Sequence, residues 1–469
     1  MKKIKKIKNH IFHFIGIGGI GMSGIAELMM KLGYRIQGSD LSLNNNIAKL
    51  KKNKKINIFI GHKKSNINKS NIVVYSSAIK KNNPEIIEAK NKSIPLLSRA
   101  EMLAQLMLNK RCIAIGGSHG KTTTTSLVGA VLQENKLDPT IINGGVINSF
   151  SSNYRLGFGK WMVVEADESD GSFIKLPHEI NIITNIDYEH MDYYKNFDSL
   201  MDAFKNFSTN IPFYGSSIIC LEDKNSFKLS QKIKTRKLIT YGFKKKYADL
   251  NIKKITTDKF FSNFIIEIKK NKFPNYKKDY VFKLNLLGKH NVLNATSAIA
   301  VALSINLPIN LIKKSLRNYK GVKRRFSYLG KIKKSFIYDD YAHHPSEIKA
   351  TLNIAKLISK KKVIVFFQPH RFSRTKYLYS EFLKVLKNVD ILYVCDIYSA
   401  GEKPIAKIHS SQIVKDLKKM GSKNAYYKKD LKNLKEFIIP YSNEENLIIF
   451  MGAGSISQWA NNLMENKIA

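Results

Sequence analysis

Apolar runs that alternate with amphipathic stretches divide the chain into three sections. The first begins at residues 10–40 (HIFHFIGIGGIGMSGIAELMMKLGYRIQGSD), whose pattern indicates a strand, a glycine turn, a helix and a second strand. The second begins at residues 111–135 (RCIAIGGSHGKTTTTSLVGAVLQEN), again strand, loop and helix. The third begins near residue 321, and helical stretches separate its strand-like runs FIYDDY, KVIVFFQPH, DILYVCDIYSA and NLIIFMGAG. Strands that alternate with helices at this spacing predict right-handed βαβ units and mostly parallel sheets.

The predicted fold is therefore α/β with three domains. We expect an N-terminal Rossmann-like domain over residues 1–110, a central P-loop ATPase-like domain over 111–321 and a C-terminal Rossmann-like domain over 322–469. A lysine-rich stretch near 240–285 alternates as β-strands do and belongs to the central domain. A chain of 469 residues is too long for one core, and its 43% apolar content argues against disorder.

Composition narrows the choice of partners and compartment. The formal charge of +43 comes mostly from lysine, since only ten of the 79 basic residues are arginine. The lysines are spread along the chain without an aromatic-rich basic motif, so we expect no nucleic-acid partner. Three distant cysteines predict neither a disulfide framework nor a metal cluster, which favours a cytoplasmic location. No apolar run is long enough to span a membrane. We expect a monomer or a homodimer.

The first section contains a nucleotide-binding signature. Residues 16–21 (GIGGIG) match G-x-G-x-x-G between a strand and a helix, and Asp40 follows Gly21 by 19 residues at the end of the next strand. Glycines there allow a diphosphate to approach the helix N-terminus, and the acid binds a ribose hydroxyl. The spacing alone fits NAD and a UDP-sugar equally well.

The second section contains a phosphate loop that is one residue short of the general pattern. Residues 116–123 (GGSHGKTT) place Lys121 to reach the β- and γ-phosphates, and the hydroxyl of Thr122 or Thr123 to hold Mg²⁺. An acidic segment follows the apolar strand WMVV, where a metal-holding carboxylate is expected; its acids are Glu165, Asp167, Glu168 and Asp170. His190, in DYEHMD, is a further candidate ligand.

Two clusters of basic residues end strands of the third section. They lie in DDYAHHPSE (339–347) and QPHRFSRT (368–375) and comprise His343, His344, His370, Arg371 and Arg374. Such a cluster attracts anions. Zinc binding is the alternative, but no pair of these residues has zinc-site spacing with a third ligand nearby.

Taken together, these motifs resemble the ATP-dependent Mur ligases of bacterial cell-wall synthesis. The resemblance covers nearly the whole chain, through GIGGIGMSGIAE, GSD, SSAI, RAEML, GSHGKTTT, EADESD, EHMD, GKHNVLNA, RRF, DDYAHHPSE, FQPHRFSRT and GAGSI. The histidine-rich motifs are most similar to the member that adds L-alanine to UDP-N-acetylmuramate. The family's loop has the form G-[ST]-x-G-K-[ST], which needs no extra residue. Tyr154 and Ala342 stand where the family more often has a small residue and glycine.

The resemblance implies substrates, cofactors and residue roles. UDP-N-acetylmuramate would bind at Gly18, Gly19, Ile20, Gly21, Ser39, Asp40, Ser76 and Arg99. ATP would bind at Gly117, Ser118, His119, Gly120, Lys121, Thr122, Thr123, Asn291, Asn294, Arg325 and Asp340. Magnesium would bind Thr122, Glu165 and His190, and L-alanine would bind at His343, His370, Arg371 and Arg374. The implied catalytic residues are Lys121, Glu165, His190, His343, Arg371 and Arg374.

Three other functions are alternatives to this one. A sister ligase that adds another amino acid or a peptide would share most of the motifs. An NAD-dependent oxidoreductase would explain the first domain but neither the phosphate loop nor the acidic strand end. A nucleic-acid-stimulated ATPase rests on net charge alone. Some relatives carry a carbamylated lysine, a role that we do not assign to Lys205.

Overall fold

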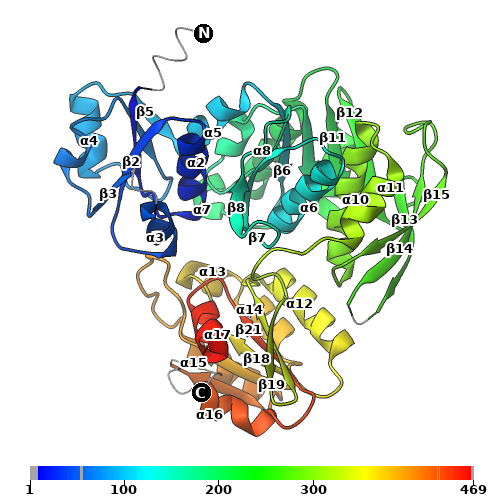
Figure 1. Ribbon diagram of the computed structural model, residues 1–469. Helices are drawn as coiled ribbons and strands as arrows, with labels where there is room; N and C mark the ends of the chain where they lie inside the picture. The colour runs from blue at the N-terminus through cyan, green and yellow to red at the C-terminus, as the bar shows by residue number, and fades with distance from the viewer. Residues whose placement is uncertain (1–8, 53–55, 259, 430, 432–433, 466–469) are drawn as a thin grey trace. The chain divides into compact units, whose positions relative to one another are not determined.

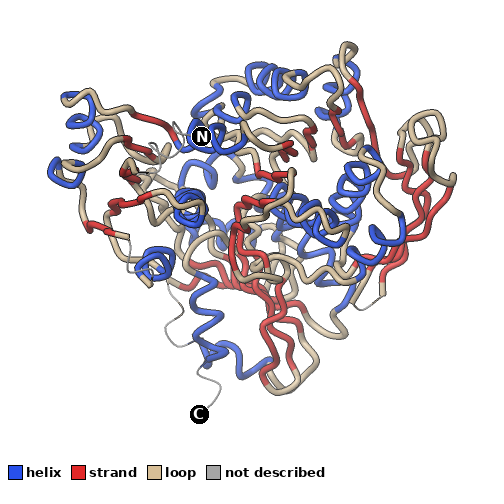
Figure 2. The backbone as a smooth tube through the Cα atoms, turned by 45° about the horizontal axis from the view of Figure 1, so that its top comes forward, coloured by secondary structure: helices blue, strands red, loops and turns tan. Residues whose placement is uncertain are grey.

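The computed structural model describes residues 9–52, 56–258, 260–429, 431 and 434–465 of the chain. Contacts divide it into two compact units, residues 1–321 and 322–469, and each is described by itself. The first unit contains a five-stranded and a ten-stranded sheet, and the second contains a six-stranded sheet (Figure 1). Most strand pairs are parallel, which confirms the predicted α/β fold. Figure 2 shows helices beside the strands of both units.

The first sheet is entirely parallel, with strand order β3-β2-β1-β4-β5. Its strands are β1 (Ile11–Ile15), β2 (Arg35–Asp40), β3 (Asn57–Ile60), β4 (Ile72–Tyr75) and β5 (Leu96–Ser98), and its helices are α2 (Ile20–Lys31), α3 (Asn45–Lys51), α4 (Pro84–Asn91) and α5 (Arg99–Met107), with a 3₁₀ turn at Lys64–Ile67. Phe12 and Phe14 of β1 pack in the core with α2, whereas Ile15 packs in a separate core with α4. Both faces are therefore covered, as expected for a parallel sheet.

The second sheet has the order β15-β14-β13-β12-β11-β10-β6-β9-β7-β8. Its strands are β6 (Arg111–Gly116), β7 (Thr140–Ile147), β8 (Ser152–Arg155), β9 (Trp161–Glu165), β10 (Ile180–Ile183), β11 (Ser216–Cys220), β12 (Lys237–Phe243), β13 (Leu250–Thr257), β14 (Ser262–Ile268) and β15 (Asp279–Leu284). Its helical segments are α6 (Lys121–Glu134), Ser172–Lys175, α7 (Met191–Tyr194), α8 (Phe197–Thr209), α9 (Lys224–Lys232), α10 (Lys289–Ser304) and α11 (Ile309–Arg317). Cys112 and Ala114 face one core and Ile113 and Ile115 the other, so β6 is buried on both sides.

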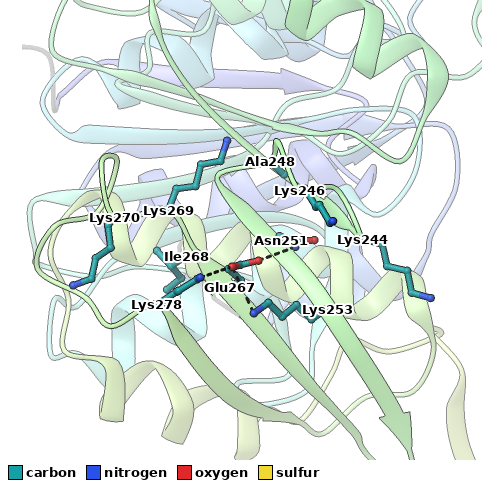
Figure 3. A pocket seen from close by; sticks show the side chains of 10 residues that line it. All are labelled: Lys244, Lys246, Ala248, Asn251, Lys253, Glu267, Ile268, Lys269, Lys270 and Lys278. Atoms are coloured by element: carbon teal, nitrogen blue, oxygen red, sulfur yellow. Dashed lines mark hydrogen bonds and ion pairs between the residues drawn. The ribbon is translucent and has the colours of Figure 1, made fainter.

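The lysine-rich stretch forms antiparallel strands at the β15 edge of this sheet, as the alternation of its residues predicted. A cavity of about 810 Å³ opens there around one carboxylate, Glu267 (Figure 3). Glu267 pairs with Lys253 at 3.5 Å and with Lys278 at 3.3 Å. The other lysines that line the cavity are Lys244, Lys246, Lys269 and Lys270.

The sheet of the second unit has the order β16-β17-β21-β18-β19-β20, and only the β16–β17 pair is antiparallel. Its strands are β16 (Ser327–Ile332), β17 (Ser335–Asp340), β18 (Val363–Phe367), β19 (Ile391–Cys395), β20 (Ala425–Lys428) and β21 (Leu447–Met451). Its helical segments are α12 (Pro345–Ile358), α13 (Phe372–Tyr377), α14 (Tyr379–Leu386), α15 (Ser410–Lys419), α16 (Leu434–Ile438), Ile439–Tyr441 and α17 (Ile456–Glu465). Among the described residues, no helix is both long and apolar enough to cross a membrane.

Candidate functional site

The phosphate loop joins the buried strand β6 to helix α6, and its two inner glycines are required by backbone shape. Gly117 has φ +126° and Gly120 has φ +84°, values that side chains disfavour. A Cβ on Gly120 would also lie 2.7 Å from Oδ1 of Asn294 on α10. Asn185, after β10, accepts from the Ser118 and His119 amides at 3.1 and 2.8 Å. The loop is thus held in shape from two sides.

Lys121, the first residue of α6, is bound to a carboxylate. Its Nζ donates to both oxygens of Glu168 at 2.9 and 2.8 Å and to the Gly117 carbonyl at 2.6 Å. Burial disfavours the ammonium, but the surrounding carboxylates, Glu168 first, outweigh this and raise the pKa of Lys121. A phosphate that bound here would have to replace Glu168 as the partner of Lys121.

The acidic segment after β9 brings Glu168, rather than Glu165, next to the predicted metal ligand His190. Ligand atoms of Glu168, Glu189 and His190 all lie within 4.8 Å of one another. Two carboxylates of this kind suit a hard divalent cation such as Mg²⁺. Glu165 instead accepts from the Gly144 amide at 2.7 Å. The set Thr122, Glu165 and His190 therefore stays a prediction, to which the structure adds two carboxylates.

His190 is held in an uncommon backbone conformation. It has φ +59° and directly precedes the short helix α7. A residue without glycine's freedom adopts this region at a cost, and such positions cluster at functional sites. Its Nε2 lies 3.7 Å from a Glu168 oxygen. The strained backbone thus holds the imidazole next to the buried carboxylate that binds Lys121.

The asparagines expected at ATP lie near the phosphate loop. Asn294 is buried on α10 beside Gly120, and its Nδ2 lies 3.4 Å from Oδ1 of Asn291. Asn291 donates to the Leu287 carbonyl at 2.8 Å. The two side chains form a polar pair, and Asn294 lies next to Gly120, the glycine that precedes α6.

The first glycine turn uses Asp40 as an internal acceptor. The Gly18 amide donates to Oδ2 of Asp40 at 2.8 Å, and the Gly16 amide donates to the Ser39 carbonyl at 2.8 Å. Any side chain on Gly21 would meet the Arg99 guanidinium at 2.9 Å. The structure thus brings together the predicted UDP-sugar residues of the turn, of the β2 end and of α5.

Ser39 and Arg99 each have a partner that the sequence did not indicate. The Ser39 hydroxyl is buried and donates to Glu85 at 2.6 Å, so it faces the interior. Arg99 donates to Asp167 of the acidic segment at 3.0 Å. This ion pair links the start of α5 to the segment that also contains Glu168.

In the second unit, Asp340 ends β17 as a buried carboxylate. It accepts from the amides of Phe326 and Ala342, both at 2.7 Å. Burial raises its pKa to about 6, although Arg325 and the two amides favour the charged form. Such a carboxylate, fixed at a strand end, is suited to accept hydrogen bonds from sugar hydroxyls.

The predicted amino-acid residues gather around two neighbouring imidazoles, which meet edge to face. The rings of His343 and His370 are 5.7 Å apart, and Arg374 donates to Nδ1 of His370 at 3.3 Å. Arg371 has φ +71° and ψ 136°, which is rare for a residue other than glycine. Burial and the neighbouring His343, Arg374 and Arg371 lower the pKa of His370 to about 3. This positive surrounding is suited to a carboxylate ligand.

Sequence reasoning missed Glu347 and Glu85. Glu347 contacts both Arg325 and His343, at 3.5 and 3.3 Å. A signal for it was present, because HPSE places a glutamate three residues after a helix N-cap, the spacing of a capping box. Glu85 had no such signal, since Ser39 precedes it by 46 residues.

The three sheets define a three-domain α/β protein, and comparison with known proteins identifies its family. Three family models match in order: the Mur ligase catalytic domain over residues 11–111, the Mur ligase middle domain over 115–302, and the glutamate ligase domain of Mur ligases over 324–454. The chain belongs to the Mur ligase family.

Individual relatives are similar over nearly their full length. UDP-N-acetylmuramate–L-alanine ligase of Rickettsia felis is 47% identical over 458 residues, 96% of this chain and 95% of that protein. The Agrobacterium fabrum enzyme of that name is 45% identical over 453 residues, 96% of this chain and 95% of that protein. The crystal structure of UDP-N-acetylmuramate–alanine ligase from Thermotoga maritima matches with a TM-score of 0.82 and 29% identity, over 98% of this chain and 99% of that one.

Proposed function

We propose that this protein joins L-alanine to the carboxylate of UDP-N-acetylmuramate and converts ATP to ADP and phosphate. The observation that carries the proposal is the match to relatives named UDP-N-acetylmuramate–L-alanine ligase, at 45–47% identity over 96% of this chain. All three sections of the chain take part in the match. The buried free thiols of Cys112, Cys220 and Cys395 suit a reducing compartment, so we place the reaction in the cytoplasm.

The reaction requires activation of a carboxylate. An amine does not displace oxide or hydroxide from a carboxylate at neutral pH. The lactoyl carboxylate therefore attacks the γ-phosphorus of ATP to give an acyl phosphate and ADP. The neutral amine of L-alanine then attacks the carbonyl carbon, and phosphate leaves with the electrons of the C–O bond.

The first unit supplies charge for the phosphoryl transfer. Lys121 exchanges Glu168 for the phosphates of ATP and neutralises the γ-phosphoryl oxygens. Thr122, Glu165 and His190 are the residues that we propose for Mg²⁺, with Glu168 and Glu189 as further carboxylates beside His190. When bound, Mg²⁺ screens the negative charges of the two reacting anions from each other.

The second unit supplies the amino-acid end of the site. Arg371 and Arg374 pair with the carboxylate of L-alanine, which a planar guanidinium binds through two parallel hydrogen bonds. Asp340 accepts from the ribose of ATP, and Arg325 binds its phosphates. The residues proposed for ATP are thus divided between the two units, so turnover requires both.

A direct test measures phosphate release from ATP with UDP-N-acetylmuramate and each amino acid in turn. We expect release with L-alanine and little with bulky or acidic amino acids. A murein peptide ligase from Psychrobacter arcticus shares the fold at 19% identity with a TM-score of 0.72, so a tripeptide should be included among the acceptors. Release with the tripeptide and none with L-alanine would favour a sister ligase instead.

A further inference from the structure

His343 and His370, whose rings are neighbours in the second unit, have opposite hydrogen-bonding environments. Nδ1 of His343 lies 3.0 Å from the Tyr341 carbonyl oxygen and 3.3 Å from Oε2 of Glu347. The carbonyl oxygen can only accept a hydrogen bond, and the same holds for the carboxylate oxygen when Glu347 is ionised. Nδ1 of His343 must therefore carry the hydrogen. In the neutral ring the basic nitrogen of His343 is therefore Nε2.

His370 has the reverse tautomer. Nη1 of Arg374 lies 3.3 Å from Nδ1 of His370, and a guanidinium can only donate. Nδ1 of His370 is therefore the acceptor, and its Nε2 carries the hydrogen. Burial and the positive groups around the ring hold the pKa of His370 at about 3, so the ring stays neutral at physiological pH. His370 is a hydrogen-bond donor toward a ligand and a poor acceptor of its proton.

Glu347 is fixed at the point where it can stabilise a charged His343. As the third residue of α12, it accepts from the His343 and His344 amides at 3.2 and 3.4 Å. Its other oxygen lies 3.5 Å from Nη1 of Arg325. A carboxylate held at Nδ1 of a histidine keeps the ring in one tautomer and favours the imidazolium, as in hydrolase triads.

We propose that His343 accepts the ammonium proton of the amino-acid substrate at Nε2 and that Glu347 is its positioning residue. The N–H bond of the ammonium breaks, its electrons stay on nitrogen, and the proton moves to Nε2. The neutral amine then forms the C–N bond, the C–O bond to phosphate breaks, and the departing phosphate takes up the second proton that the nitrogen loses. This inference rests on the proposed function, because it takes the substrate to be an amino acid that binds near His343 and His370.

The surroundings of His343 define what a pH experiment reports. It is faced by Glu347 on α12, by the ring of Tyr341 at 5.3 Å and by the ring of His370 at 5.7 Å, with Arg374 on the far side of His370. Because the pKa of His370 is so low, the acidic limb of the alanine-dependent rate does not report protonation of His370.

The test compares His343→Gln, Glu347→Gln and His370→Gln by kcat/KM for L-alanine across the pH range. We expect losses of about 10²-fold or more for His343→Gln and about tenfold for Glu347→Gln at neutral pH. Both defects should shrink as pH rises, by up to about tenfold per pH unit, because more alanine is already neutral. His370→Gln should raise KM and keep the acidic limb.

A partial reaction and a matched control separate this role from a structural one. Acyl phosphate formed without alanine, trapped by borohydride reduction, should stay within about twofold of wild type in Glu347→Gln. Glu381 is likewise the third residue of its helix, α14, and is exposed, so Glu381→Gln should behave as wild type. A His343→Gln defect that is equal at every pH would overturn the proposal, as would equal loss of both half-reactions in Glu347→Gln. Failure of the wild-type protein to use L-alanine would instead refute the proposed function.

Discussion

Asp340 should make the second unit less stable at neutral pH than at pH 4, and Asp340→Asn should remove this dependence. The carboxyl is only 6% exposed, and its pKa rises from 3.8 to about 6 on folding. That difference of about two pH units corresponds to about 3 kcal/mol of unfolding free energy. Below pH 3.8 the group is neutral in both states and has no effect.

The sign follows from proton binding. Between pH 3.8 and 6 the unfolded chain releases the proton and the folded chain retains it, so stability falls as pH rises. Above pH 6 the full cost of the buried charge is present. Asparagine cannot ionise, but it loses an acceptor for the Phe326 or Ala342 amide, which costs about 1–3 kcal/mol at every pH. The pH dependence of the difference in unfolding free energy between variant and wild type therefore reports the effect of the charge alone.

Amide hydrogen exchange in the full-length protein can measure this difference. The amides of β18, the buried neighbour of β21 in the sheet of the second unit, report its opening free energy. Comparing variant with wild type at the same pH cancels the intrinsic exchange rate. We expect the opening free energy of the variant, relative to that of wild type, to rise by about 3 kcal/mol between pH 4 and pH 8. An equal difference at both pH values would refute the reasoning, and a raised KM for ATP would show that the charge is retained for binding.

Three more predictions follow from the first unit. Glu168→Gln should raise the Mg²⁺ concentration needed for half-maximal phosphate release by tenfold or so, since it removes a carboxylate beside Lys121; an unchanged Mg²⁺ curve would argue against Glu168 as a ligand. Glu85→Gln should lower the opening free energy that hydrogen exchange of β2 reports, by about 3 kcal/mol at pH 7 and by less below pH 4.5. The reason is that buried partners lower the pKa of Glu85, so its contribution to stability is lost on acidification. An unchanged opening free energy at pH 7 would show that the charge is unimportant. Lys269→Gln with Lys278→Gln should leave kcat unchanged, and added DNA should not stimulate turnover; stimulation by DNA would support a nucleic-acid partner.

Much of the fold could be predicted because parallel strands covered on both faces are continuous apolar runs. The runs that became β6, β18 and β21 are buried along nearly their whole length. By contrast, β16 (SYLGKI) and β20 (AYYK) carry polar residues and lie at the two edges of their sheet. Their pattern resembles that of a loop, and only pairing with β17 and β19 makes them strands.

In the candidate site, too, features set by the local chain could be predicted, and features set by contacts in the folded protein could not. Glycine positions could be predicted because a positive φ at Gly120 is a property of the local chain. Which carboxylate contacts Lys121 could not be predicted, because Glu165 ends β9, Glu168 follows three residues later, and the turn after the strand decides between them. The tautomer of His343 likewise depends on two acceptors that only the folded loop brings to Nδ1.

The large positive charge carries less functional information than the few arginines do. Lys253 and Lys278 pair with Glu267 on the surface, and exposed pairs of this kind contribute about 0–1 kcal/mol and weaken with salt. Arg99, Arg325 and Arg374 are instead partly buried against Asp167, Glu347 and His370. The Arg99 guanidinium favours the charged form of Asp167, and that of Arg374 fixes the tautomer of His370, tasks that the flexible lysine ammonium performs poorly. In a chain whose basic residues are mostly lysine, the positions of the arginines therefore indicate functional sites better than the net charge does.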